Sequence, residues 1–123
     1  DIQVTYAELS VLNVLWEHGP ATIRQITARI YKNRTTAEYA TVQKLLERLE
    51  AKRCVSRNRS RPAHLFSAKV DRARLIGDQL RQTAEKLCHG SMTPLLMQLV
   101  ESTRLTARDR DVLRKLLEGG PQS

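Results

Sequence analysis

Apolar residues recur at helical spacing along most of the chain, in segments that are separated by short turn-forming stretches. The first segment opens with Thr5 and Glu8 at the spacing of a capping box, and Gly19-Pro20 ends it. Thr22 and Gln25 form a second box at the start of a shorter segment with inward-facing isoleucines. The pattern therefore predicts two helices within the first 31 residues.

A third helix with two contrasting faces is predicted from Thr35 or Thr36 to about Lys52, with Thr35 and Glu38 at the spacing of a capping box. The face expected to be buried carries apolar side chains at helical spacing: Tyr39, Val42, Leu46 and Leu49. The opposite face is small, hydroxylic and basic: Ala40, Thr41, Lys44 and Arg48. A helix that is fixed by one face and presents such groups on the other fits the major groove of DNA.

A two-stranded hairpin is predicted after this helix, with strands over residues 54–59 and 63–68 and a turn at Ser60-Arg61-Pro62. We expect Arg57, Arg59 and Arg61 at its tip. Three short helices cannot bury all their apolar faces alone, so the hairpin covers one end of their core. The sequence thus predicts a winged helix-turn-helix domain over residues 1–69, in a mainly α protein.

Residues 70–123 are predicted to form further amphipathic helices that begin near Asp71, Pro94 and Thr106. So few residues bury little surface as a lone unit, which favours pairing with a second chain as a helical homodimerisation domain. The residues expected at that interface are all apolar: Ile76, Leu80, Leu87, Leu95, Leu99, Leu113, Leu116 and Leu117. The alternative is that these helices fold back onto their own winged domain.

Positive charge is concentrated in one block of the chain. The formal net charge is +8, and residues 24–61 alone hold 11 basic and 3 acidic residues, a surplus of 8. Residues 70–123 hold 9 basic and 7 acidic residues, a surplus of only 2. A basic block that coincides with a helix–hairpin unit indicates a polyanionic partner, although basic surface also aids solubility.

Candidate DNA contacts follow from this placement. On the third helix, Lys44 and Arg48 are expected to contact DNA directly, with Thr41 and Gln43 at base edges or phosphates. The alternative for Arg48 is an ion pair with Glu47 or Glu50. The hairpin would contact phosphates or the minor groove through Arg57, Arg59, Arg61 and His64. The alternative is that it is a solvated wing that only covers the core.

Three groups of residues, in order along the chain, match one bacterial family. The first covers the opening helices: Val4-Thr5, Glu8, Val11-Leu12, Val14–Glu17 and Gly19–Thr22. The second covers the third helix: Tyr39, Thr41-Val42, Leu45-Leu46 and Arg48-Leu49. The third lies near the C-terminus: Gly90-Ser91, Leu95, Leu99–Glu101, Leu105-Thr106, Leu113 and Leu116-Leu117. Together they resemble the penicillinase repressors, a family that also includes copper-responsive repressors.

This resemblance implies a cytoplasmic, dimeric transcriptional repressor that binds a dyad operator in double-stranded DNA upstream of resistance or stress-response genes. In the antibiotic-responsive branch, a membrane sensor-protease pathway leads to cleavage in the C-terminal domain. The matching pair here is Gln98-Leu99, where better-known members carry Asn-Phe. Ala37 and Lys44 replace residues common in the family, Trp and Thr, so the operator sequence is expected to differ.

Other classes of function find little support in the sequence. The histidines form no HxxxH pair, Cys54 and Cys88 belong to no CxxC or CxC motif, and no phosphate-binding loop or nucleophile elbow occurs. We therefore expect no enzyme, metal, cofactor, copper control or membrane insertion. The main rival hypothesis is a protein-interaction adaptor that uses the winged domain without specific DNA binding.

Overall fold

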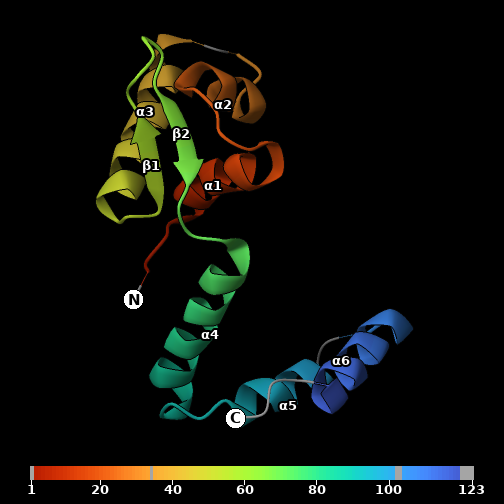
Figure 1. Cartoon of the computed structure of the whole chain (residues 1–123). Helices are drawn as coiled ribbons and strands as arrows, with labels where there is room; N and C mark the ends of the chain where they lie inside the picture. The colour runs from red at the N-terminus through yellow and green to blue at the C-terminus, as the bar shows by residue number, and fades with distance from the viewer. Residues whose placement is uncertain (1, 34, 102–103, 120–123) are drawn as a thin grey trace. The chain divides into compact units, whose positions relative to one another are not determined.

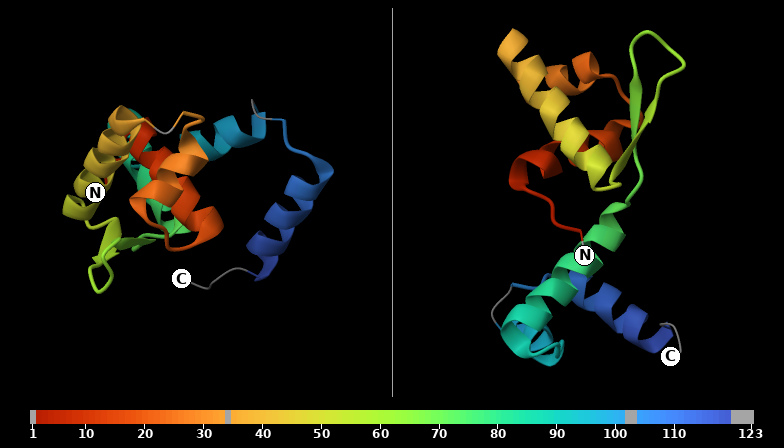
Figure 2. Two further views of the ribbon diagram at one scale, coloured as in Figure 1. Left: turned by 90° about the horizontal axis from the view of Figure 1, so that it is seen from above. Right: turned by 90° about the vertical axis from the view of Figure 1, so that its left-hand side faces the viewer.

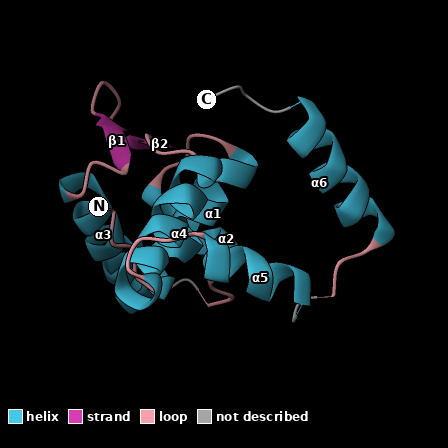
Figure 3. Ribbon diagram, turned by 90° about the horizontal axis from the view of Figure 1, so that it is seen from below, coloured by secondary structure: helices cyan, strands magenta, loops and turns pink. Residues whose placement is uncertain are grey.

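The computed structural model describes residues 2–33, 35–101 and 104–119 (Figure 1). Within these residues the chain forms six helices and one two-stranded antiparallel sheet, which confirms the predicted mainly α winged-helix architecture (Figure 3). The chain divides into two compact units, Asp1–Leu80 and Arg81–Ser123. Among the described helices, none combines the length and the hydrophobicity of a membrane span.

The first unit begins with three capped helices, α1 (Tyr6–His18), α2 (Ile23–Ile30) and α3 (Thr36–Ala51). Each opens with a reciprocal capping box, as predicted, and the cap of α3 is Thr35 rather than Thr36. These boxes satisfy backbone N–H groups that a helix N-terminus leaves unpaired. Gly19 ends α1 with a φ of 79°, which favours glycine.

The wing consists of β1 (Val55–Asn58) and β2 (Leu65–Ala68), which lie beside α3 (Figure 2). A short backbone bridge between Ala21 and Phe66 ties the α1–α2 turn to β2, a pairing that the sequence did not predict. The register places Arg57 inside β1, opposite Phe66, so the prediction that Arg57 lies at the hairpin tip was wrong. Strand pairing ends at Asn58, and the connecting loop contains Arg59, Arg61 and His64.

The core of this unit is built from one face of each helix and the inner face of the wing. On α3 the buried residues are Val42, Leu45, Leu46 and Leu49. Tyr39, which was predicted on this face, is only half-buried, and Leu45 is buried in addition to the three other predicted residues. Phe66 from β2 is fully buried in the same core.

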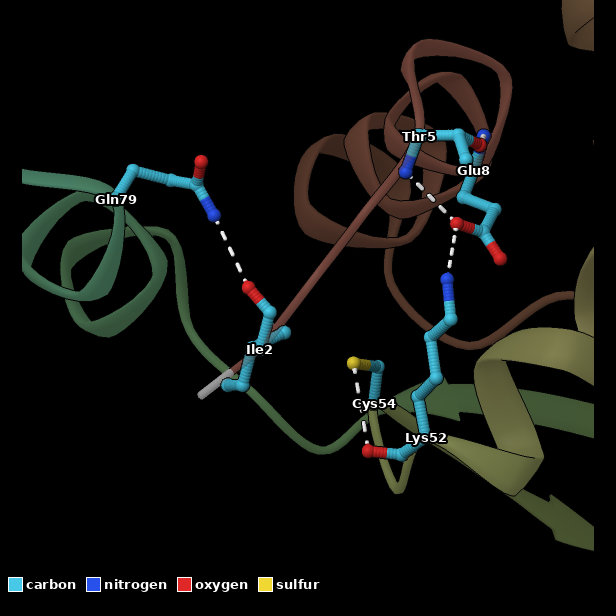
Figure 4. A network of polar contacts seen from close by, with 6 residues as sticks. All are labelled: Ile2, Thr5, Glu8, Lys52, Cys54 and Gln79. Carbon is cyan, nitrogen blue, oxygen red and sulfur yellow. Dashed lines mark hydrogen bonds and ion pairs between the residues drawn. The ribbon is translucent and has the colours of Figure 1, made fainter. Parts of the chain in front are cut away.

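An ion pair between a buried carboxylate and a partly exposed lysine joins the start of α1 to the end of α3 (Figure 4). Glu8 is 0% exposed, and its Oε1 accepts hydrogen bonds from Thr5 N at 2.8 Å and from Lys52 Nζ at 2.6 Å. Burial favours the neutral acid, but the hydrogen bonds from Lys52 and Thr5 outweigh it and lower the pKa of Glu8. The carboxylate that caps α1 therefore also fixes the C-terminal end of α3.

This lowered pKa predicts a loss of stability in acid. Glu8 contributes its stabilisation fully above its ordinary pKa of 4.5, and the contribution is lost as the pH falls through the lower pKa of the folded state. We expect the free energy of unfolding to fall more steeply below pH 4.5 in the wild type than in Glu8→Gln. Urea unfolding of both proteins from pH 7 to pH 3 measures the difference, and parallel pH profiles would contradict this assignment.

The remaining helices are α4 (Arg72–Cys88), α5 (Thr93–Glu101) and α6 (Ala107–Gly119), which start within three residues of the predicted positions. Asp71 Oδ1 accepts from Arg74 N at 2.7 Å, and Thr106 and Asp109 form a reciprocal cap at the start of α6. Leu75 of α4 is buried in the core of the first unit. By contrast, α5 and α6 bury none of their described residues.

Candidate nucleic-acid interface

The solvent-facing side of α3 carries the residues that the sequence singled out for DNA contact. Thr41, Gln43, Lys44 and Arg48 are all exposed, while the opposite side of the helix packs against α1, α2 and β1. Burial of one face fixes the helix, so the exposed side chains start from a rigid backbone. A rigid helix loses little backbone freedom when it enters a groove.

The two cations on this face, Lys44 and Arg48, are exposed. Lys44 and Arg48 have no ion pair within the part of the chain that the structure describes. Glu50, the alternative partner considered for Arg48, is directed to the wing instead. Two uncompensated cations four residues apart lie on the same side of a helix, at a spacing suited to one groove.

Thr41 lies in the same exposed row, beside two alanines. Its Oγ1 donates a hydrogen bond to Ala37 O at 2.9 Å, so the hydroxyl proton is already in use. The Thr41 hydroxyl can still accept a hydrogen bond, and its methyl group can contact the methyl group of thymine. The small side chains of Ala37 and Ala40 leave room for a close approach of DNA to the helix backbone.

The wing loop supplies a second set of exposed cations. Arg59 and Arg61 are exposed and His64 is half-buried. Asn58 Oδ1 accepts from Ser60 N at 2.9 Å, a local turn that shapes the start of the loop. Arg57 differs from these residues, because its side chain is 17% exposed and pairs with Glu50.

A groove of about 450 Å³ lies between the start of α2, the middle of α3 and the wing. Gln43 and His64, which are 21 positions apart in the sequence, both line it. Thr22 and Arg24 line the α2 side, next to backbone N–H groups that the first turn of a helix leaves unpaired. Sequence reasoning did not name Arg24; its only signal was its place at the start of the basic block.

The predicted interface residues of the C-terminal half fall into two groups. Leu95 and Leu113 are half-buried. The exposed group consists of Ile76, Leu80, Leu87, Leu99, Leu116 and Leu117. The exposed fraction is largest for Leu87, at 77%, and Leu117, at 84%. The predicted cleavage pair, Gln98-Leu99, is exposed near the end of α5.

Reactive or metal-binding chemistry finds no support in the described residues. They contain no group of three or more His, Cys, Asp or Glu side chains that could hold a metal ion. Burial raises the pKa of the Cys54 thiol, which disfavours the reactive thiolate.

Comparison with known proteins adds an independent observation. The family model described as "Penicillinase repressor" matches residues 4–119. The chain is 21% identical over 116 residues to a penicillinase repressor of Bacillus licheniformis, covering 94% of this chain and 90% of that protein. It is 22% identical over 116 residues to a penicillinase repressor of Staphylococcus aureus, covering 94% of this chain and 91% of that protein.

Proposed function

The chain belongs to the penicillinase repressor family, a regulatory family of transcriptional repressors, and from this premise we propose that it binds operator DNA as a homodimer. Each winged domain inserts α3 into the major groove of one half-site of a dyad operator. The observation that carries this proposal is the exposed face of α3, whose cations Lys44 and Arg48 have no acidic partner among the described residues.

Base recognition is assigned to α3 and phosphate binding to the surrounding surface. Arg48 has the chemistry to bind guanine O6 and N7 in a bidentate manner, and Gln43 to bind adenine. Arg59, Arg61 and His64 approach the backbone or a narrow minor groove from the wing. Arg24 and the start of α2 border the groove beside Gln43, which suits a phosphate.

The second copy of the chain is proposed to cover the apolar side chains of α4, α5 and α6. Leu87 and Leu117 are large and mostly exposed, and α5 and α6 bury none of their described residues. Exposed leucines in such density are typical of an interface between protein chains. Sedimentation of the protein at micromolar concentration tests this part: a dimer is expected, and a strict monomer would contradict it.

Repression is proposed to end through the family's proteolytic route, with a cut at Gln98-Leu99. Both residues are exposed on α5, in the half of the chain assigned to dimerisation. A cut there would separate the winged domain from half of the residues proposed to join two copies, those from Leu99 onward. Fragment mass after induction of the producing cell tests this step, and an intact chain in derepressed cells would contradict it.

A titration against two duplexes tests DNA binding and separates it from the adaptor hypothesis. One duplex carries the region upstream of the chain's own gene, and the other is a scrambled sequence of equal length and composition. A repressor of this type binds the first duplex about 10³-fold or more tightly. Equal weak binding to both duplexes would favour the adaptor.

Salt dependence provides a prediction for the wing. Each neutralised phosphate steepens the dependence of log affinity on log salt by about 0.9. Arg59→Ala removes one such contact per chain, so the slope of the dimer is expected to fall by about 1.8, with equal weakening on operator and scrambled DNA. Anisotropy titrations between about 50 and 200 mM salt measure the slope. An unchanged slope would exclude Arg59 as a phosphate contact.

A further inference from the structure

The carboxylate of Glu50 lies at the junction between the end of α3 and the wing, where it faces two arginines. Its Oε1 is 3.0 Å from Arg57 Nη2, and its Oε2 is 3.9 Å from Arg59 Nη2. Glu50 is on α3 and the two arginines follow on β1 and just after it. One acidic side chain therefore links the helix that is proposed to contact bases to the hairpin that is proposed to contact the phosphate backbone of DNA.

Arg57 is held on a second side by an aromatic ring. Its guanidinium carbon lies 4.8 Å from the centroid of the Phe66 ring, a cation–π distance. Phe66 is itself fixed, because it is fully buried and its backbone bonds in both directions to Ala21, at 2.8 and 3.0 Å. Arg57 is thus clamped between a carboxylate of α3 and a ring of β2.

The two arginines differ in what they leave for DNA. The side chain of Arg57 is 17% exposed, and its Nε is buried without a hydrogen-bond partner among the described residues. The side chain of Arg59 is 64% exposed, and its contact with Glu50 is long. Arg57 also lines the groove beside Gln43 and His64, but its charge is compensated by Glu50 at 3.0 Å. Arg59, by contrast, can leave Glu50 for a phosphate.

From this geometry we propose that Arg57 is a positioning residue, which together with Glu50 and Phe66 sets the height of the wing above α3, and that it makes no phosphate contact. The inference rests on the proposed DNA-binding function and replaces the expectation that Arg57 neutralises a phosphate. A wing fixed in this way presents Arg59 and Arg61 at a constant distance from the groove that α3 enters. Loosening the clamp lowers selectivity for the operator.

The first test removes the clamp without changing net charge, in the double variant Glu50→Gln with Arg57→Gln. We expect its affinity for the upstream duplex to fall about fivefold while the salt slope stays at the wild-type value. Arg59→Gln is the matched control, and its slope is expected to fall by about 1.8. A slope that fell as much in the double variant, or an affinity that did not change, would overturn the inference.

A second test needs no DNA and so separates this inference from the proposed function. Amide hydrogen exchange of the hairpin is measured in wild type, in each single variant and in the double variant. We expect exchange at β1 and β2 to speed up about three- to tenfold in each variant. The double variant should be no faster than Arg57→Gln, because Glu50 has already lost its 3.0 Å partner once the Arg57 guanidinium is gone. Unchanged exchange would overturn the clamp, whereas failure of the wild type to bind DNA would reject only the proposed function.

Discussion

Replacing Lys44 and Arg48 together by alanine is expected to lower affinity for the operator at least a hundredfold. A good contact to a base edge discriminates by about 1–3 kcal/mol, and a dimer uses each residue twice. Affinity for scrambled DNA should fall much less, because phosphate contacts from the wing remain. Anisotropy titrations with the upstream and scrambled duplexes at one salt concentration measure both losses.

The matched control for this variant removes two exposed cations from α6, Arg108 and Lys115. The net charge changes equally, but the side chains lie outside the proposed interface with DNA. Operator affinity of this control should stay within about threefold of wild type, since exposed charges that contact no base or phosphate are largely screened by salt. If the α3 variant lost no more than the control, or lost operator and scrambled DNA equally, α3 would not read the operator.

Replacing Lys52 by methionine is expected to lower the free energy of unfolding by about 3 kcal/mol at neutral pH. The change leaves Glu8 fully buried without its cation, and Glu8 Oε2 already lacks a partner among the described residues. Urea unfolding followed by circular dichroism measures the effect. Lys115→Met is the matched control, because Lys115 pairs with Asp111 on the surface and should contribute less than about 0.5 kcal/mol.

A second substitution shows whether the loss arises from the stranded carboxylate. Glu8→Gln retains the shape of the side chain and much of the capping box but removes the charge. The double variant Glu8→Gln with Lys52→Met should therefore be more stable than Lys52→Met alone, by about 1–2 kcal/mol. A double variant that was less stable than Lys52→Met would show that the Glu8 carboxylate stabilises the fold even without Lys52, through its capping contacts with Thr5.

Local features of this fold were predictable because their causes lie within a few residues. The capping boxes at Thr5, Thr22 and Thr35 formed as expected, and they set where the first three helices begin. The alternation on either side of Ser60-Arg61-Pro62 located both strands of the wing to within two residues. These features depend on backbone hydrogen bonding and side-chain periodicity over one or two turns.

Features that depend on contacts distant in sequence were missed. Glu8 was recognised as a capping residue, but its burial follows from a partner 44 positions away, Lys52. The bridge from Ala21 to Phe66 joins segments that no local pattern links. Arg57 was counted with the wing arginines because spacing alone does not show that Glu50 comes within 3.0 Å of it.

The candidate site likewise has a part that local sequence predicted and a part that depends on contacts distant in sequence. The exposed row of Thr41, Lys44 and Arg48 followed from helical periodicity, which fixes the face opposite a buried stripe. The groove that brings Gln43 and His64 together with Arg24 required the tertiary arrangement of α2, α3 and the wing. The exposed leucines of α5 and α6 were predicted as apolar stripes, but helical periodicity alone does not say which surface covers them.

The most direct measurement of the central claim is the stoichiometry and footprint of the complex on the DNA upstream of the chain's own gene. Sedimentation of the complex should give two chains per duplex. Footprinting should give two protected half-sites whose centres are about one helical turn, or a whole number of turns, apart. One chain per duplex, or protection that is no stronger than on scrambled DNA at low salt, would contradict the account.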